Sequence, residues 1–284
     1  TFQLVEPEHR KDQTLLVGGK KMTGKELKEG MLQAMRSKVA GEAAPYNRLY
    51  RPEKDGVATT FPGFVAPALG IDPYRATPDD VKEIARGHLL LAAANALQPG
   101  VFSLSTWDLV GALPVSGEEV DKRTTDGDFR WHNRGGVDLM GANPEAAASA
   151  FGLPRAKALY GTLPEQLKDP DSFASRMKTL LAARRKFRVA EGELLAVPEP
   201  CGPGLCVLIL KLPDYPVAVT VLNFAREATG IDLDLGELAR RVPDGDWTDI
   251  MTGKAAGTAR GGRLQLQLPA LAGTTLVPPA VRPK

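Results

Sequence analysis

The chain is poor in cysteine, in net charge and in long apolar runs, and each shortage excludes a class of protein. Cys201 and Cys206 are the only cysteines in 284 residues. Two are too few for a disulfide framework, and a structural zinc site needs about four ligands. They flank a Gly-Pro-Gly turn that a disulfide could cross, but two reduced thiols in a cytoplasmic protein are the favoured interpretation.

Charge and hydrophobicity exclude two kinds of partner. The 36 basic residues face 34 acidic ones, a formal net charge of +2, and no long basic run indicates binding to nucleic acid or to an anionic membrane. No apolar run approaches the roughly 20 residues that span a bilayer. The first residues show neither an initiating methionine nor a signal-peptide pattern, so we expect residue 1 to be an internal position of a longer protein.

Several motifs of catalysis are also absent. No group of His, Cys, Asp and Glu has metal-ligand spacing, no glycine-rich phosphate loop follows a strand, and no G-x-S-x-G pattern suggests a serine nucleophile. We therefore expect no cofactor, and we leave open whether a longer parent enzyme binds calcium. His88 lies on an apolar helix and is interpreted as a core histidine.

The most informative stretch that is present runs from residue 78 to 113. Thr77, Pro78 and Asp80 predict a capped helix start, and Gln98-Pro99-Gly100 ends the helix. The run 101–104 (VFSL) predicts a short buried strand, which is followed at once by an aromatic residue and a carboxylate. A helix that feeds such a strand is typical of an α/β barrel, where ligand sites lie at the carboxyl end of the strands.

The organisation of the chain changes near residue 190. Helices are predicted over 24–38 and 172–188, and the polar segment 114–170 is expected to form functional loops or small helices over a site. After Gly192 the helical period disappears, and short apolar runs between turn residues predict an antiparallel β-sandwich. The expected strands are Leu194–Val197, Leu205–Leu212, Val217–Phe224, Ile231–Leu235 and Leu264–Leu268.

The order of four segments resembles the C-terminal half of enzymes of the α-amylase superfamily, glycoside hydrolase family 13. The segments are PGVFSLSTWDLVGAL, SFASRMKTLLAARRKF, AVTVLNFA and WTDIMTG. In that family the last barrel helix carries a Leu-x-x-x-Arg pattern, matched by Leu180 and Arg184, and a sandwich strand ends in Asn-Phe, matched by Asn223-Phe224. The segments GVFSLSTWDLVGALP and RWHNRGGVDL are most similar to the sequences of trehalose synthase-like members of the family, which interconvert maltose and trehalose.

The resemblance covers residues 45–280 and implies a fold and a division into domains. Residues 1–190 are expected to form the C-terminal half of a (β/α)8 barrel with long loops. Residues 191–284 are expected to form the C-terminal β-sandwich. The missing N-terminal half of the barrel is then a required partner, and exposed strand edges favour association, with the oligomeric state left open.

The resemblance also implies a catalytic residue. Retaining glucosyl transfer needs a carboxylate nucleophile and a carboxylic acid, which the family carries on strands upstream of this chain. A third aspartate of the family follows a histidine, and the best match here is Lys54-Asp55, where lysine replaces the histidine. Asp55 is therefore the candidate catalytic residue and Lys54 a candidate substrate-binding residue. The alternative is an ordinary charged turn over 53–56.

Three further side chains are candidates for binding a sugar. Trp107 and Trp131 can pack against the apolar C–H faces of a sugar, and Asp108 can accept hydrogen bonds from its hydroxyls. The alternative is structural: Trp107 plugs the barrel end, Asp108 caps the following turn, and the group 131–134 (WHNR) is a packing cluster that holds its loop.

Three hypotheses about function remain. In the first, the chain is part of a cytoplasmic enzyme that interconverts maltose and trehalose by retaining intramolecular glucosyl transfer, with a disaccharide as substrate. In the second, the parent is a hydrolase or glucanotransferase of the same superfamily that acts on longer α-glucans. In the third, the chain is a non-catalytic glycan-binding or assembly module.

Overall fold

The computed structural model describes residues 12–17, 19–49, 56–124, 129–199 and 202–279. Contacts between Cα positions divide the chain into two compact units. The first comprises residues 1–85 and 105–168, and the second comprises residues 86–104 and 169–284. In the described part of the chain, no helix is long and apolar enough to cross a membrane.

The first unit begins with a hairpin and a helix. Strands β1 (Thr14–Val17) and β2 (Lys20–Thr23) pair antiparallel and lead into α1 (Gly24–Val39), which confirms the helix expected over 24–38. The hydroxyl of Thr23 accepts a hydrogen bond from the backbone N–H of Glu26 at 3.2 Å, and the Glu26 carboxylate accepts one from the N–H of Thr23 at 2.7 Å. This reciprocal cap explains why the helix starts at this point. The next elements are η2 (Gly41–Ala43), β3 (Arg48–Leu49), β4 (Val57–Ala58) and α2 (Phe61–Ala68).

Helix α3 (Pro78–Ala96) starts where the sequence predicts and runs from the first unit into the second. The carboxylate of Asp80 accepts a hydrogen bond from the N–H of Thr77 at 2.9 Å, and the Thr77 hydroxyl accepts one from the N–H of Asp80 at 3.2 Å. The prediction of a buried strand at 101–104 is wrong. These residues form no strand, because none of the described strands pairs with them, and the side chain of Val101 is fully exposed.

Small elements and loops follow in the first unit, beginning with α4 (Thr106–Val110). Within segment 114–170, where small helices or loops are expected, lie α5 (Glu118–Asp121), η3 (Phe129–Asn133) and α6 (Leu163–Gln166). They enclose a small core formed by Val110, Ala112, Val115, Val120, Leu153 and Ala156. The named strands of this unit form two antiparallel pairs, β1–β2 and β3–β4. A barrel of the predicted kind requires parallel strands, and such a barrel is not evident among the described residues.

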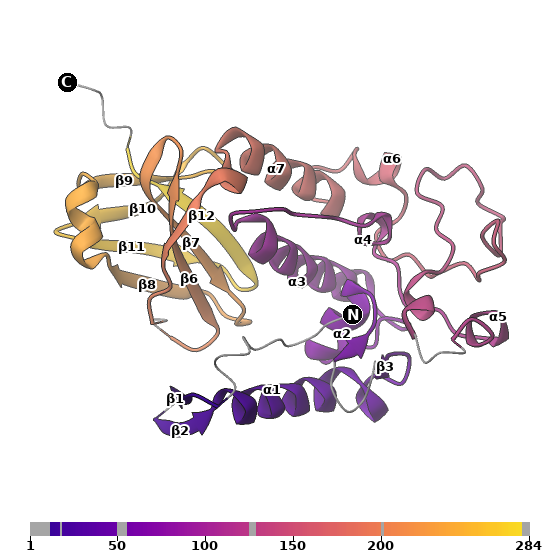
Figure 1. Cartoon of the computed structure of the whole chain (residues 1–284). Helices are drawn as coiled ribbons and strands as arrows, with labels where there is room; N and C mark the ends of the chain where they lie inside the picture. Colours follow the sequence, from indigo (N-terminus) through magenta and orange to yellow (C-terminus); the bar gives the residue numbers. More distant parts are fainter. Residues whose placement is uncertain (1–11, 18, 50–55, 125–128, 200–201, 280–284) are drawn as a thin grey trace. The chain divides into compact units, whose positions relative to one another are not determined.

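The second unit contains one antiparallel sheet of eight strands in the order β5-β6-β7-β12-β9-β10-β11-β8 (Figure 1). This confirms antiparallel β structure after residue 192. The strands are β5 (Glu193–Ala196), β6 (Leu205–Leu212), β7 (Tyr215–Asn223), β8 (Thr229–Asp234), β9 (Gly245–Asp249), β10 (Ala255–Arg260), β11 (Arg263–Leu268) and β12 (Ala272–Val277). Two short turns of 3-10 helix, η4 (Val189–Glu191) and η5 (Gly236–Arg241), flank them.

The sheet curls so that its two halves enclose one core. The halves are joined at β12 and β9 by only two residue pairs, Leu276↔Asp249 and Val277↔Thr248. Buried side chains of both halves meet in that core, including Val219 from β7 and Leu264 from β11. Along β11 the leucines are buried and the residues between them are exposed, as the alternation in RLQLQL predicts.

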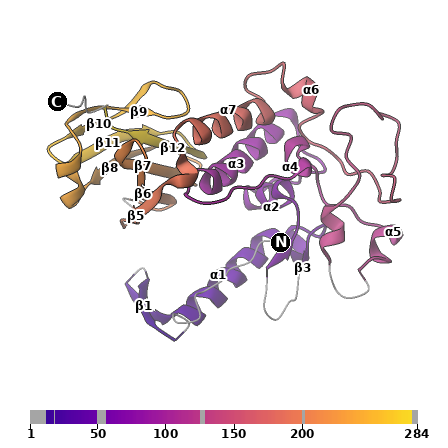
Figure 2. The same ribbon diagram turned by 45° about the horizontal axis from the view of Figure 1, so that its top comes forward.

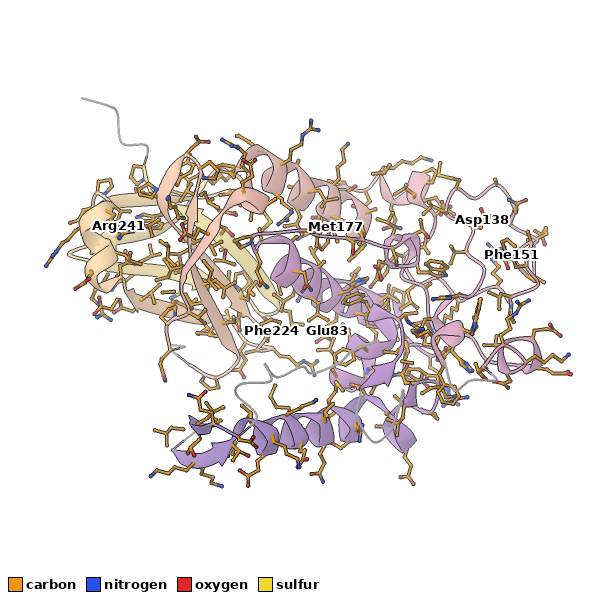
Figure 3. The ribbon with its side chains drawn as sticks, viewed as in Figure 1. Glu83, Asp138, Phe151, Met177, Phe224 and Arg241 are labelled. Atoms are coloured by element: carbon orange, nitrogen blue, oxygen red, sulfur yellow. The ribbon has the colours of Figure 1, made fainter. Side chains whose placement is uncertain are left out.

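The second face of β6, β7 and β12 is covered by helices. Residues 86–96 of α3 and helix α7 (Phe173–Lys186) lie side by side next to these strands in both views (Figures 1 and 2). A Cβ atom at Gly273 of β12 would lie 2.6 Å from the side chain of Leu222 and 3.3 Å from that of Leu90. Met177 of α7, labelled in Figure 3, is 1% exposed. Helix and sheet therefore share a close-packed interface within this unit.

The contact-based units differ in their boundaries from the sequence-based domains 1–190 and 191–284. The sequence boundary follows the change of hydrophobic period, whereas contacts group α7 and the second half of α3 with the strands. The sequence-based division stays a prediction about the parent fold.

Candidate functional site

The candidate catalytic residue Asp55 and its neighbour Lys54 lie outside the described residues. The strands that precede and follow them in the sequence, β3 and β4, pair antiparallel through Arg48↔Ala58 and Leu49↔Val57. The roles of Asp55 and Lys54 therefore stay predictions.

Asp108 lies in the first turn of the short helix α4. Its Oδ2 accepts hydrogen bonds from the N–H and the hydroxyl of Ser105 at 3.1 Å and 2.9 Å, and Ser105 Oγ accepts one from the N–H of Asp108 at 3.4 Å. Burial raises the pKa of this carboxyl, and the hydrogen bonds from Ser105 act in the opposite direction. The Asp108 carboxylate thus helps to cap the start of α4. Capping was the structural alternative to sugar binding in the sequence analysis.

The end of α4 is fixed by a contact with Tyr160. Gly111 ends the helix with φ at +64°, and a Cβ atom there would lie 2.6 Å from the Tyr160 ring. Burial and the nearby charge of Asp108 raise the pKa of the Tyr160 hydroxyl well above its usual value. A glycine is needed here both for the left-handed backbone and for the close approach of the ring.

Trp107 and Trp131 come together at one small core. Trp107 Nε1 donates a hydrogen bond to the carbonyl of Gly135 at 2.7 Å, and both tryptophans pack against the core around Val110 and Val115. The guanidinium carbons of Arg134 and Arg123 lie 4.9 Å and 5.6 Å from the centroid of the Trp131 ring. Cations at this distance are attracted to the π-face of the indole. These contacts are those of a packing cluster, and the sugar-binding roles stay predictions.

His132 lies in segment 130–139 (RWHNRGGVDL) and contacts Val115, the residue directly after segment 100–114 (GVFSLSTWDLVGALP). It is 1% exposed, its Nδ1 lies 2.7 Å from the carbonyl of Val115, and the N–H of Val115 donates to the carbonyl of His132 at 2.7 Å. Nε2 lies 3.4 Å from a carboxylate oxygen of Asp121. Segments 100–114 and 130–139 are joined directly by the hydrogen bond from Trp107 to Gly135, and His132 contacts the residue that follows the first segment.

Metal ligands do not converge in the part of the chain described above. Among those residues, no three His, Cys, Asp or Glu side chains are placed to hold an ion. Cys206 is a free thiol on β6. The other cysteine, Cys201, lies outside the described residues.

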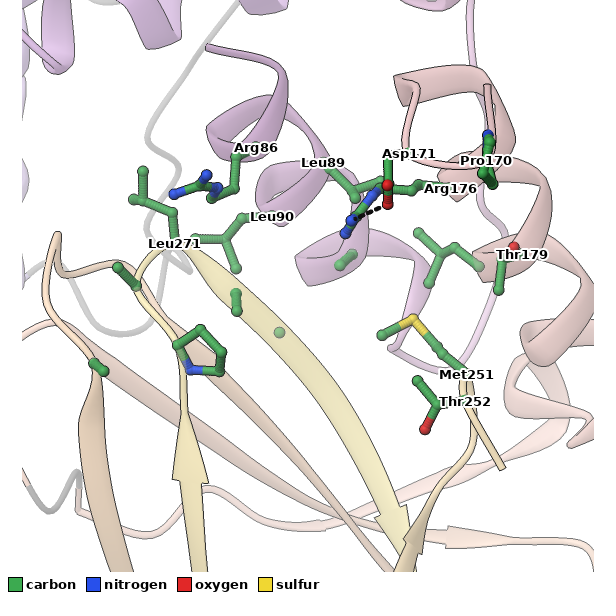
Figure 4. A pocket seen from close by; sticks show the side chains of 17 residues that line it. Arg86, Leu89, Leu90, Pro170, Asp171, Arg176, Thr179, Met251, Thr252 and Leu271 are labelled. Atoms are coloured by element: carbon green, nitrogen blue, oxygen red, sulfur yellow. Dashed lines mark hydrogen bonds and ion pairs between the residues drawn. The ribbon is translucent and has the colours of Figure 1, made fainter. Parts of the chain in front are cut away.

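The second unit contains a cavity of about 660 Å³ that the sequence did not indicate (Figure 4). It is lined by residues of α3, of α7 and the segment that leads into it, and of β12 and the loops next to β8, β9 and β12, including Arg86, Leu90, Arg176, Met251 and Leu271. No local pattern predicts it, because these residues come from segments far apart in the sequence. Of the predicted site residues that the structure describes, Trp107, Asp108 and Trp131, none lines it.

Comparisons with known proteins show the fold of the chain. No protein-family model and no curated protein matches the sequence. Eubacterium rectale Amy13B is similar in structure, with a TM-score of 0.50, 17% identity, and coverage of 78% of this chain and 37% of that chain.

Two further similar structures have lower TM-scores. A trehalulose synthase variant in complex with Tris has a TM-score of 0.49 at 14% identity, covering 71% of this chain and 39% of that one. An isomaltulose synthase variant from Erwinia rhapontici NX5 with D-glucose has a TM-score of 0.47 at 13% identity, with the same two coverages. The chain thus spans well under half the length of each protein. Its described residues share their fold with a part of Amy13B.

Proposed function

We propose that this chain is the C-terminal part of an α-glucoside-transforming enzyme of the α-amylase superfamily. The observation that carries the proposal is the fold shared with Amy13B over 78% of this chain. The order of sequence motifs supports it independently, because helix α3, helix α7 and the antiparallel sheet follow one another as in the family. Since the chain spans 37% of Amy13B, the activity belongs to a longer parent protein.

Within that superfamily we propose interconversion of maltose and trehalose by retaining intramolecular glucosyl transfer in a cytoplasmic enzyme. The support is the pair of segments that resemble trehalose synthase-like proteins, 100–114 and 130–139, which are joined by the hydrogen bond from Trp107 to Gly135. The hydrogen bond from Val115 to His132 lies directly next to the first segment. Segments that bind each other in this way can act as one loop unit over a bound sugar.

The proposed chemistry divides between the parent and this chain. The parent's missing barrel half supplies the nucleophile and the acid, which form and cleave the glucosyl–enzyme bond. Asp55 stabilises the positive charge that develops on the sugar ring, and the ammonium of Lys54 keeps that carboxylate ionised. Trp107, Trp131 and Asp108 hold the sugar, and exclusion of water favours reattachment of glucose over hydrolysis.

Product analysis tests the proposal. The full-length parent is incubated with maltose and, separately, with a longer α-glucan, and the sugars are separated by chromatography. Trehalose as the main product from maltose supports the proposal. Shorter glucans from the long substrate without trehalose would point to a hydrolase or glucanotransferase instead. Binding of α-glucan without any turnover would identify a glycan-binding module.

A further inference from the structure

The cavity of the second unit has the size and shape of a small-molecule site. Its volume of about 660 Å³ falls within the range of about 300–1,000 Å³ usual for ligand pockets. Its wall is largely aliphatic. The side chains that matter for the argument are Leu89 and Leu90 of α3, Leu180 of α7, Met251 after β9, and Leu271 before β12.

The lining does not suit a sugar. The described residues that line it include no aromatic ring and no Asn, Gln or His side chain, whereas sugar sites use aromatic faces and convergent polar groups. Its two threonine hydroxyls already donate hydrogen bonds within the protein. Thr252 donates to the carboxylate of Asp249 at 2.9 Å, and Thr179 donates to the carbonyl of Ser175 at 3.2 Å.

Among the described residues that line the cavity, one positive charge has no ion-pair partner. Asp171 and Arg176 form an ion pair at 2.7 Å and neutralise each other. The side chain of Arg86 makes no hydrogen bond and no ion pair with any of the residues that the structure describes. In Figure 4 it lies on the side of Leu90 and Leu271, and the Asp171–Arg176 pair lies on the side of Leu89.

We propose that this cavity binds an aliphatic molecule with an anionic head group, of the class of medium-chain carboxylates. The guanidinium of Arg86 presents a fork of N–H donors that matches a carboxylate. The alkyl chain lies along Leu90, Leu271 and Met251, where burial of its methylene groups removes apolar surface from water and favours binding. The site is separate from the proposed glucosyl chemistry and does not depend on it.

The test is isothermal titration of the 284-residue protein with decanoate, with decyltrimethylammonium and with maltose. We expect decanoate to bind and the other two to show no specific binding. Arg86→Gln should weaken decanoate binding at least about tenfold, the scale of a lost charge-assisted hydrogen bond. The matched control is Arg185→Gln on α7, an exposed arginine outside the cavity, which should leave the affinity unchanged.

A second variant tests the cavity itself. Thr179 lines it but is exposed on α7, so Thr179→Phe should fold, as checked by circular dichroism, and should obstruct the alkyl chain. We expect it to weaken decanoate binding as well. Absence of decanoate binding, equal affinity for the cationic amphiphile, displacement of decanoate by maltose, or unchanged affinity in both variants would each overturn the proposal.

Discussion

His88 is a buried histidine whose charge state should influence stability. Its ring stacks on Phe173 with centroids 4.3 Å apart, and burial lowers its pKa to about 3. The unfolded chain has a histidine pKa of about 6.5. Between these values only the unfolded state binds the proton, so this contribution to stability is complete above about pH 6.5 and is lost as the pH falls.

Urea unfolding at pH 7.0, 6.0 and 5.5 measures this effect. We expect the free energy of unfolding of the wild-type protein to decrease toward low pH by up to about 1.4 kcal/mol per unit from this group. His88→Gln should lower stability at pH 7.0 but show a smaller further loss at pH 5.5. Parallel pH dependences in the two proteins would show that His88 is not the titrating group.

Asp55 carries the catalytic prediction at the residue scale. In the full-length parent, Asp55→Asn should lower turnover of maltose at least about 100-fold with a smaller effect on substrate affinity, because a preorganised charge stabilises mainly the transition state. Steady-state kinetics measure both quantities. Glu53→Gln, two residues away, is the control and should be nearly silent. Near-normal turnover by Asp55→Asn would leave the charged-turn interpretation.

Single residues also show why only part of the site could be predicted. Ser105 and Asp108 have the spacing of a helix capping box. The strand expected at 101–104 argued against a helix that starts directly after it. The burial of His88 is predictable from the sequence, because it depends only on the apolar pattern of its own helix. The hydrogen bond from Trp107 to Gly135 spans 28 positions, and no local pattern predicts such a partner.

At the scale of elements, Arg184 joins two helices. It is 8% exposed, and its guanidinium donates to the carbonyl of Ala96, the last residue of α3, and to the carbonyls of Gln98 and Gly100 just after the helix, that of Gln98 at 2.7 Å. A helix leaves its last carbonyls unpaired, so a cation at that end both caps them and stabilises the helix dipole. The Leu-x-x-x-Arg pattern thus has a structural explanation within the second unit.

Arg184→Gln should therefore destabilise the protein by about 2–4 kcal/mol, because the buried carbonyls lose charged donors. Denaturant unfolding measures the loss. The neighbouring Arg185, which is exposed, provides the control, and Arg185→Gln should change stability by less than about 0.5 kcal/mol. Equal losses in both variants would refute the capping role of Arg184.

Gly273 sets the distance between β12 and its neighbours. Gly273→Val should cost about 1–3 kcal/mol, because its Cβ would lie 2.6 Å from Leu222 in a packed interface. Gly30→Ala on α1, where a Cβ meets open space, should instead stabilise by up to about 1 kcal/mol. Thermal unfolding of both variants checks the two signs. A neutral Gly273→Val would mean that helix and sheet can separate without cost.

Strand prediction succeeded where the residues are strongly apolar and failed elsewhere. Strands β6, β7 and β11 are predictable from the sequence, because their residues are strongly apolar or alternate between apolar and polar. Strands β9, β10 and β12 (GDWTD, AAGTAR and AGTTLV) are rich in small and polar residues, and their pairing depends on partners distant in the sequence. The run VFSL at 101–104 is the reverse case, a strand-like composition without a partner strand.

At the scale of the whole molecule, the sequence indicated the antiparallel second part but not the cavity. Periodicity reports which face of one element is apolar, whereas the cavity arises where residues 86–93, 170–180 and 251–273 meet. The barrel expected for residues 1–190 rests on the resemblance and on a partner half that this chain does not contain. The central claim about activity is therefore that this chain needs the missing barrel half to act on maltose.

The most direct test compares the full-length parent with the 284-residue chain, each incubated with maltose. We expect the parent to form trehalose and glucose. The isolated chain should form neither, because it lacks the nucleophile and the acid, and loss of either group removes most of the rate. Steady trehalose formation by the purified 284-residue chain, or a parent that leaves maltose and longer α-glucans unchanged, would contradict the account.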